Sequence, residues 1–192
     1  MKTISNTLFT LVALVGSLLL APTASANDSY SSAIATFKQA SETHKFFDSA
    51  YGYAIFPTIG KGGLGIGAAY GKGRVYRGGA YTGDSSMTQV SIGFQIGGQA
   101  YSEIIFFKDA QAYRDFTSGS FEFGAQASAV AINAGANAQA GTTGNSAGAG
   151  QAGGSQAAKA AYINGMAVFT AAKGGLMVEA ALAGQSFTFE AQ

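Results

Sequence analysis

Apolar side chains recur with two different spacings along the chain, and the spacing changes near Tyr51. Within residues 30–50 the side chains of Ile34, Phe37 and Ala40 follow one another every three or four residues, which is the period of an amphipathic helix. From Tyr51 onward apolar residues alternate with small or polar ones, which is the period of a strand. The pattern therefore predicts N-terminal helices followed by a largely β chain.

Alternation is clearest in residues 88–97, where one side carries Thr88, Val90, Ile92, Phe94 and Ile96 and the positions in step with Gln89 are small or polar. This stretch predicts a half-buried strand. One helix is expected among the strands, from Ala110 to Phe116, with Asp109 as its N-cap. Similar alternation predicts further strands at Tyr51–Phe56, Leu64–Tyr70, Arg74–Tyr81, Tyr101–Phe107, Phe121–Ile132, Ile163–Phe169, Leu176–Leu182 and Ser186–Glu190.

These elements predict a single α+β domain that is mainly antiparallel β, with about eight strands in a curved sheet or barrel-like sandwich. An internal repetition supports antiparallel hairpins, because GYAIF at residues 52–56 precedes KGGL at 61–64, and GMAVF at 165–169 precedes KGGL at 173–176. Each unit is expected to form a strand, a lysine-bearing glycine turn and a second strand. Chance repetition in a glycine- and alanine-rich chain is the alternative.

The first residues have the pattern of a secretory signal peptide. Lys2 precedes an apolar run at residues 8–20, and a small-residue triplet at 24–26 follows it. Such a run covers about 20 Å of a roughly 30 Å hydrocarbon core, which argues against a membrane anchor. Residues 1–26 are expected to be a cleavable signal peptide and residues 27–192 the mature domain. Because the chain has no cysteine for lipid attachment, we expect a periplasmic or secreted location.

Composition narrows the classes of function. The chain has 11 Lys and Arg against 10 Asp and Glu, no Cys and one His, which argues against a nucleic-acid binder and a multi-histidine or thiolate metal site. The G-x-G-x-x-G pattern at residues 60–65 continues as a strand, so it is not a dinucleotide-binding turn. Residues 141–160 carry no large apolar side chain and are expected to form a flexible loop. No catalytic residue, metal ligand or cofactor is predicted, and we do not expect an enzyme.

The segment from Ser49 to Gly83 combines basic and tyrosine side chains and contains no acidic residue. A locally basic, tyrosine-rich surface suits an anionic amphiphile such as a phospholipid headgroup. Glycines beside Lys61 and Lys173 would add backbone N–H groups that bind anions. Alternatively, the basic side chains are solvated and the tyrosines belong to the core. The candidate headgroup-binding residues are Lys61, Lys72, Arg74, Arg77 and Lys173.

Several motifs together resemble the SYLF domain. They are YGYAIFPTIGKGGL at residues 51–64, GKGRVY at 71–76, QIGGQAYSEIIF at 95–106, FEFGAQAS at 121–128, and GMAVF with KGGL within 165–176. The likeness runs in order from Ala33 to Glu190. SYLF domains are known as lipid-binding modules, described in eukaryotes as binding phosphoinositides and, in yeast relatives, actin.

The resemblance implies a non-enzymatic lipid-binding protein whose partner is acidic phospholipid or a membrane surface. In eukaryotic members an amphipathic N-terminal helix contributes to membrane contact, and the matching positions here are Ile34, Phe37, Lys38 and Lys45. Actin is not expected as a partner, because the predicted signal peptide directs export. A small outer-membrane β-barrel or a structural envelope protein is the alternative class of function.

Overall fold

The computed structural model describes residues 24–64, 66–92, 99–124, 127, 129–132, 160–173 and 182–192 of the 192-residue chain. Residues 1–23 of the predicted signal peptide and residues 141–159 of the predicted loop lie outside these ranges. The described part contains three helices and eight strands. The predicted α+β fold class is therefore confirmed.

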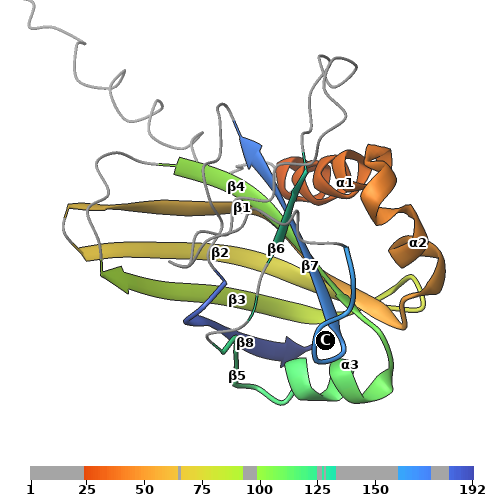
Figure 1. Cartoon of the computed structure of the whole chain (residues 1–192). Helices are drawn as coiled ribbons and strands as arrows, with labels where there is room; N and C mark the ends of the chain where they lie inside the picture. The colour runs from red at the N-terminus through yellow and green to blue at the C-terminus, as the bar shows by residue number, and fades with distance from the viewer. Residues whose placement is uncertain are drawn as a thin grey trace, which may run out of the picture.

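The strands form one curled sheet in the order β5-β8-β3-β2-β1-β4-β7-β6 (Figure 1). Neighbours run antiparallel except β6 and β7, which are parallel. The helices are α1 (Ala24–Gln39), α2 (Ser41–Ser49) and α3 (Ala110–Phe116). The strands are β1 (Gly52–Leu64), β2 (Ile66–Arg77), β3 (Ala80–Ile92), β4 (Gln99–Phe107), β5 (Phe121–Glu122), β6 (Ala129–Ile132), β7 (Met166–Lys173) and β8 (Gln185–Ala191).

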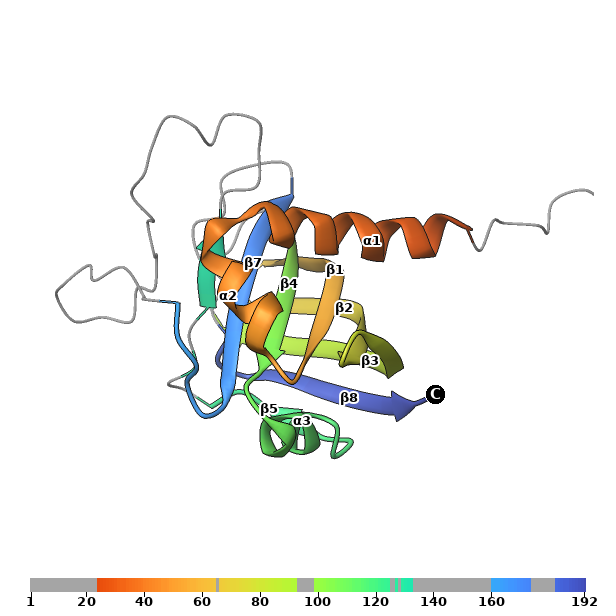
Figure 2. The ribbon, with the colours of Figure 1, turned by 90° about the vertical axis from the view of Figure 1, so that its right-hand side faces the viewer.

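Each face of the sheet carries its own hydrophobic cluster. We call the face on which α1 and α2 pack the outer face and the opposite one the inner face. Figure 2 shows α1 and α2 together beside β4 and β7, with α3 apart from them near β5 and β8. The outer cluster includes Phe37, Phe46, Ile55, Ile104, Phe106 and Phe169. The inner cluster includes Phe56, Ile59, Met87, Phe107, Phe116 and Phe187.

A bulge in β1 determines which side chains reach each face. The pairing of β1 with β2 shifts between Ile55 and Thr58, so that Phe56 and Pro57 together stand opposite Gly73. Proline has no N–H for the ladder, and a bulge is one of the few sheet positions that tolerate it. The ring of Phe56 covers Gly73 so closely that a Cβ added at Gly73 would lie 2.5 Å from it. An aromatic ring thus fills the inner face above this glycine.

The predicted strand at Arg74–Tyr81 is wrong, because it contains a turn. β2 ends at Arg77 and β3 begins at Ala80, with Gly78 and Gly79 between them at φ of 57° and 84°. Positive φ at both central residues is the geometry of a tight hairpin turn, which glycine adopts without steric strain. Side-chain alternation continues on both sides of this two-residue turn, so the period alone does not reveal it.

The predicted lysine-bearing glycine turn at residues 61–64 is also wrong, since β1 continues through Leu64. Lys61 is paired on both sides, with Ala69 of β2 and Gln99 of β4. At Lys61 the backbone is therefore part of the strand ladder and lacks the turn conformation that an anion-binding nest requires. In the second unit, residues 174–176 lie outside the described residues.

β3 is half-buried as predicted, but Val90, which lies on the side predicted to be apolar, is exposed. Met87 and Gln89 are buried on the inner face, whereas Val90 is 72% exposed. Nε2 of Gln89 donates a hydrogen bond to the backbone oxygen of Ala183, which offsets the loss of hydration. Residues 93–97 of the predicted strand lie outside the described residues.

The predicted helix at Ala110–Phe116 is confirmed together with its cap. Asp109 Oδ1 accepts hydrogen bonds of 3.0 Å from the backbone N–H groups of Gln111 and Ala112. The predicted strand at Phe121–Ile132 is instead two short strands, β5 and β6, which lie at opposite edges of the sheet. The predicted strand at residues 176–182 lies, except for its last residue, outside the described part.

Candidate functional site

The five basic candidates are divided between the two faces of the sheet. Residues that are directly opposite in neighbouring strands share a face, so the pairing assigns each of them. Three lie on the outer face: Lys72, Arg74 and Lys173. Two lie on the inner face: Lys61 and Arg77. The structure therefore does not bring all five together as one surface.

Lys72 and Lys173 flank Thr58 on the outer face. Thr58 is the partner of Lys72 in the register of β1 and β2. Its Oγ1 accepts a hydrogen bond of 2.8 Å from Nζ of Lys173. All three residues are exposed, and we call Lys72 and Lys173 the lysine pair. Two ammonium groups beside a hydroxyl provide the donors that phosphate oxygens accept.

Arg74 lies on the same face but is tied to its neighbours. Its guanidinium carbon is 4.4 Å from the ring centre of Tyr30 in α1 and 5.4 Å from that of Tyr81. Its Nε lies 3.9 Å from Oδ1 of Asp84. These cation–π contacts hold α1 against β2, and the Asp84 carboxylate offsets the positive charge. Arg74 therefore supports the fold here and adds less than the lysine pair to an anion site.

An uncovered apolar surface adjoins the lysine pair further along β2 and β3. Ile66, Tyr70 and Val90 are 67%, 51% and 72% exposed. Ala68 lies between Ile66 and Tyr70 on β2 and has only a methyl group. Gly60 and Gly62 lie beside Tyr70 and Ala68 on β1, and a Cβ added at either glycine would meet nothing within 4 Å. We call this surface the bare patch, and its residues are Gly60, Gly62, Ile66, Ala68, Tyr70 and Val90.

The four helix positions expected to contact a membrane differ in accessibility. Phe37 is fully buried in the outer cluster, and Ile34 is half-buried against it. The side chain of Phe37 lies between α1 and the sheet, so it would reach a membrane only if the helix moved away from the sheet. Lys38 and Lys45 are exposed, and Nζ of Lys45 donates a hydrogen bond of 2.8 Å to the backbone oxygen of Ala160.

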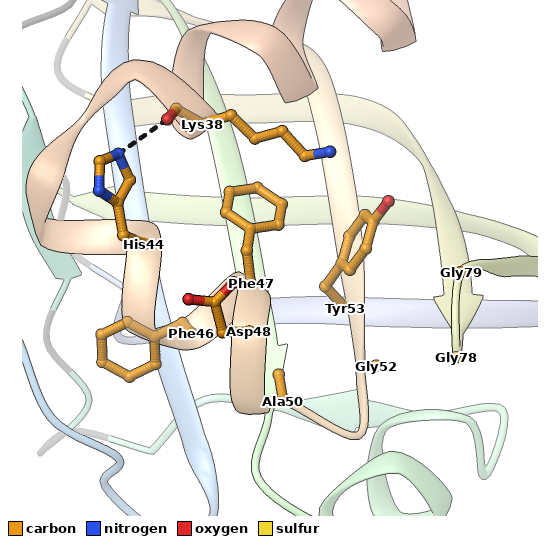
Figure 3. Close-up of a pocket in the computed structure, with 10 residues that line it drawn as sticks. All are labelled: Lys38, His44, Phe46, Phe47, Asp48, Ala50, Gly52, Tyr53, Gly78 and Gly79. Carbon is orange, nitrogen blue, oxygen red and sulfur yellow. Dashed lines mark hydrogen bonds between the residues drawn. The ribbon is translucent and has the colours of Figure 1, made fainter.

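A hollow of about 670 Å³ opens between α2, the start of β1 and the β2–β3 turn (Figure 3). Nζ of Lys38 lies 5.5 Å from the ring centre of Phe47, and Figure 3 shows it pointing toward Tyr53. His44 Nε2 lies 3.0 Å from the backbone oxygen of Lys38, and Asp48 also lines the hollow. The hollow is lined both by the ammonium group of Lys38, which lies over Phe47, and by the carboxylate of Asp48. It therefore does not favour a ligand of one charge over the other.

The inner face holds a buried carboxyl group. Glu103 of β4 is fully buried, and its Oε2 accepts a hydrogen bond of 3.1 Å from Nε2 of Gln185. The same Nε2 donates to the hydroxyl of Tyr101 at 3.2 Å. Burial raises the pKa of Glu103 to about 8, and the bond from Gln185 opposes that rise. Burial also raises the pKa of Tyr101, and the negative charge of the neighbouring Glu103 raises it further.

Sequence reasoning missed both Glu103 and the bare patch. A signal for Glu103 was present, because it is an acidic residue in the strand Tyr101–Phe107, whose last four residues are all apolar. The apolar face of residues 88–97 was also visible, but alternation does not say whether such a face is covered. Only the position of α1 and α2 over the other half of the sheet shows that Val90 is left exposed.

Within the described ranges, no three His, Cys, Asp or Glu side chains come together as a metal-binding cluster. In the same part of the chain, no helix combines the length and the apolar character needed to cross a bilayer.

The fold and the site define an α+β protein that presents lysines and an apolar patch side by side on one exposed sheet face. A family model described as Ysc84, Las17-binding protein actin regulator, matches residues 88–192, which is more than half of the chain. The chain belongs to this family, and the resemblance to the SYLF domain is thereby confirmed. A comparison with curated proteins found no match.

Proposed function

We propose that this protein is a non-enzymatic lipid-binding protein of the cell envelope, which recognises acidic phospholipid headgroups through the outer face of its sheet. The observation that carries the proposal is the lysine pair, in which Lys72 and Lys173 flank Thr58 on an exposed surface. Family membership supports lipid binding, because SYLF domains are known as lipid-binding modules.

The signal peptide predicted for residues 1–26 supports a periplasmic or secreted location. The family description names an actin regulator that binds Las17. An exported protein does not meet cytosolic actin, so the proposal takes over the lipid-binding property of the family alone.

The energetics of such a site are modest and additive. Each basic side chain near an anionic membrane contributes about 1 kcal/mol, so the lysine pair accounts for about 30-fold in affinity. The hydrogen bond to Thr58 holds Lys173 in place before binding, which lowers the entropy lost when a headgroup binds. The attraction is screened by salt, with a Debye length of about 8 Å at physiological ionic strength.

Sedimentation with vesicles tests the proposal. The purified protein is mixed with vesicles of phosphatidylcholine alone, or with vesicles that also contain phosphatidylglycerol with the same acyl chains. We expect binding to the anionic vesicles only, weakening as salt is raised. The double variant Lys72→Gln, Lys173→Gln should bind about 30-fold more weakly.

A matched control removes two positive charges elsewhere. Lys108 and Arg114 are exposed at the α3 end of the molecule, and the variant Lys108→Gln, Arg114→Gln should keep binding near that of the parent. Equal losses in the two double variants would assign binding to net charge and contradict the site. Equal binding of the parent to neutral and anionic vesicles would contradict recognition of the headgroup charge.

A further inference from the structure

We propose that the bare patch inserts into the interfacial layer of an anionic membrane, so that the protein binds lipid with the open end of its sheet rather than with its N-terminal helices. This inference rests on the proposed function, because it takes the lysine pair as the headgroup contact. It adds the apolar surface that enters the membrane and the direction from which the protein approaches.

Exposure of the patch is the first observation. Ile66 and Val90 are more than two-thirds exposed, although large aliphatic side chains are usually buried. Ile66 precedes Ala68 on the same face of β2, and Val90 of the neighbouring strand β3 is the register partner of Ala68. Neighbouring exposed apolar side chains, rather than scattered single ones, are typical of an interaction surface.

The floor of the patch is the second observation. Tyr70 stands opposite Gly60, and Ala68 stands opposite Gly62. A Cβ at either glycine would have nothing within 4 Å, so among the described residues no side chain fills that floor. A flat surface of backbone and methyl groups lets acyl chains approach closely, and apolar contact area is what strengthens interfacial binding.

Charge is the third observation, and it selects the occupant. Along the outer face of β2, Tyr70 is followed by Lys72, and Lys173 reaches the same point through Thr58. At the described outer-face positions from Thr58 to Gly62, Ile66 to Lys72 and Ser86 to Val90 there is no acidic residue. The apolar surface therefore has lysines at its rim, with Tyr70 between the apolar residues and Lys72. This order matches an anionic bilayer, because apolar side chains enter the bilayer whereas lysine and tyrosine side chains stay at its interface.

The helices provide the contrast. Phe37, the largest apolar side chain expected to reach a membrane from α1, is fully buried under that helix. In Figure 1 the ends of β1, β2 and β3 that carry the patch extend away from α1 and α2. The bilayer can therefore contact the patch without unfolding α1.

Tryptophan reporters test the inference directly, because the chain contains no tryptophan of its own. Tyr70→Trp places the reporter in the patch. Tyr51→Trp is the matched control, since Tyr51 is also exposed but lies at the opposite end of the hairpin, next to Tyr113 of α3. Vesicles contain phosphatidylglycerol and phosphatidylcholine brominated on the acyl chains. We expect a blue shift and strong quenching for Tyr70→Trp, and neither for Tyr51→Trp.

A second variant measures the apolar contribution. Ile66→Ser, Val90→Ser should weaken binding to anionic vesicles by about tenfold, while the remaining binding stays salt-dependent. If the protein sediments with anionic vesicles but the Tyr70→Trp reporter is not quenched, the insertion is wrong and the proposed function stands.

If no binding to anionic vesicles occurs at any salt concentration, the proposed function fails and the inference fails with it. The fluorescence of the Tyr70→Trp reporter could instead shift to the blue without lipid, together with dimer formation that increases with protein concentration. In that case a second copy of the chain covers the patch. That result would also overturn the inference.

Discussion

The two faces of the β1–β2 hairpin are both rich in glycine, but the surroundings of the glycines differ between the faces. On the inner face, a Cβ added at Gly71 would lie 2.6 Å from Ile59, and one at Gly73 would lie 2.5 Å from the ring of Phe56. On the outer face, a Cβ at Gly60 or Gly62 would meet nothing. Glycine on the inner face makes room for large side chains of the neighbouring strand, whereas at Gly60 and Gly62 of the outer face a side chain would not overlap any described atom.

A pair of glycine substitutions gives the largest expected effect. Gly73→Val should destabilise the fold by about 3 kcal/mol, because its side chain overlaps the ring of Phe56 in a packed core. Gly60→Val should change the free energy of unfolding by less than about 1 kcal/mol, since its side chain enters open space and valine favours strands. Urea unfolding followed by circular dichroism measures both.

If Gly60→Val destabilises the protein as much as Gly73→Val, the expected difference between the two faces is wrong. Equal effects would mean that the outer-face glycine also lies under a side chain or a partner in the free protein.

An effect of comparable size, also specific to the inner face, is expected from the pH dependence of stability. The folded protein keeps a proton on Glu103 up to about pH 8, whereas an unfolded chain releases it near the ordinary pKa of 4.5. The free energy of unfolding should therefore fall as pH rises from about 5 to about 8 and then level off, by roughly 2–4 kcal/mol. Glu103→Gln keeps the neutral form and should remove this slope, making the variant the more stable protein above pH 8.

The control for this slope is an acidic residue on the other face. Glu122 of β5 is exposed on the outer side, where Ser186 donates a hydrogen bond of 3.4 Å to its Oε2. Glu122→Gln should keep the slope of the parent protein in thermal melts between pH 5 and 9. A parent protein whose stability does not change over this range would contradict the neutral buried state of Glu103.

Features that depend on neighbouring residues could be predicted from the sequence. The N-cap at Asp109 and the helix that follows were located correctly, because a cap is formed within three residues. The alternation in β3 was equally clear. The sequence does not show which side of β3 is buried. Gln89 is buried by what packs on the inner face, and Val90 is exposed because neither α1 nor α2 packs on it.

The candidate site was predicted only as a set of residues. The sequence places Lys61, Lys72, Arg74 and Arg77 close together, but the bulge after Ile55 and the strand register assign them to different faces. Lys173 donates a hydrogen bond to Thr58, the register partner of Lys72, across a separation of 115 residues. Such a contact follows from the strand order β2-β1-β4-β7, which local patterns do not encode.

The central claim is that the open half of the outer face contacts the membrane. The reactivity of each lysine in the presence of vesicles tests this claim without any substitution. Acetylation of each lysine is measured by mass spectrometry with and without vesicles that contain phosphatidylglycerol. We expect Lys72 and Lys173 to become severalfold less reactive on the vesicles while Lys108 is unchanged. Protection of Lys38 and Lys45 with no change at Lys72 and Lys173 would place the membrane at the helices and contradict the account.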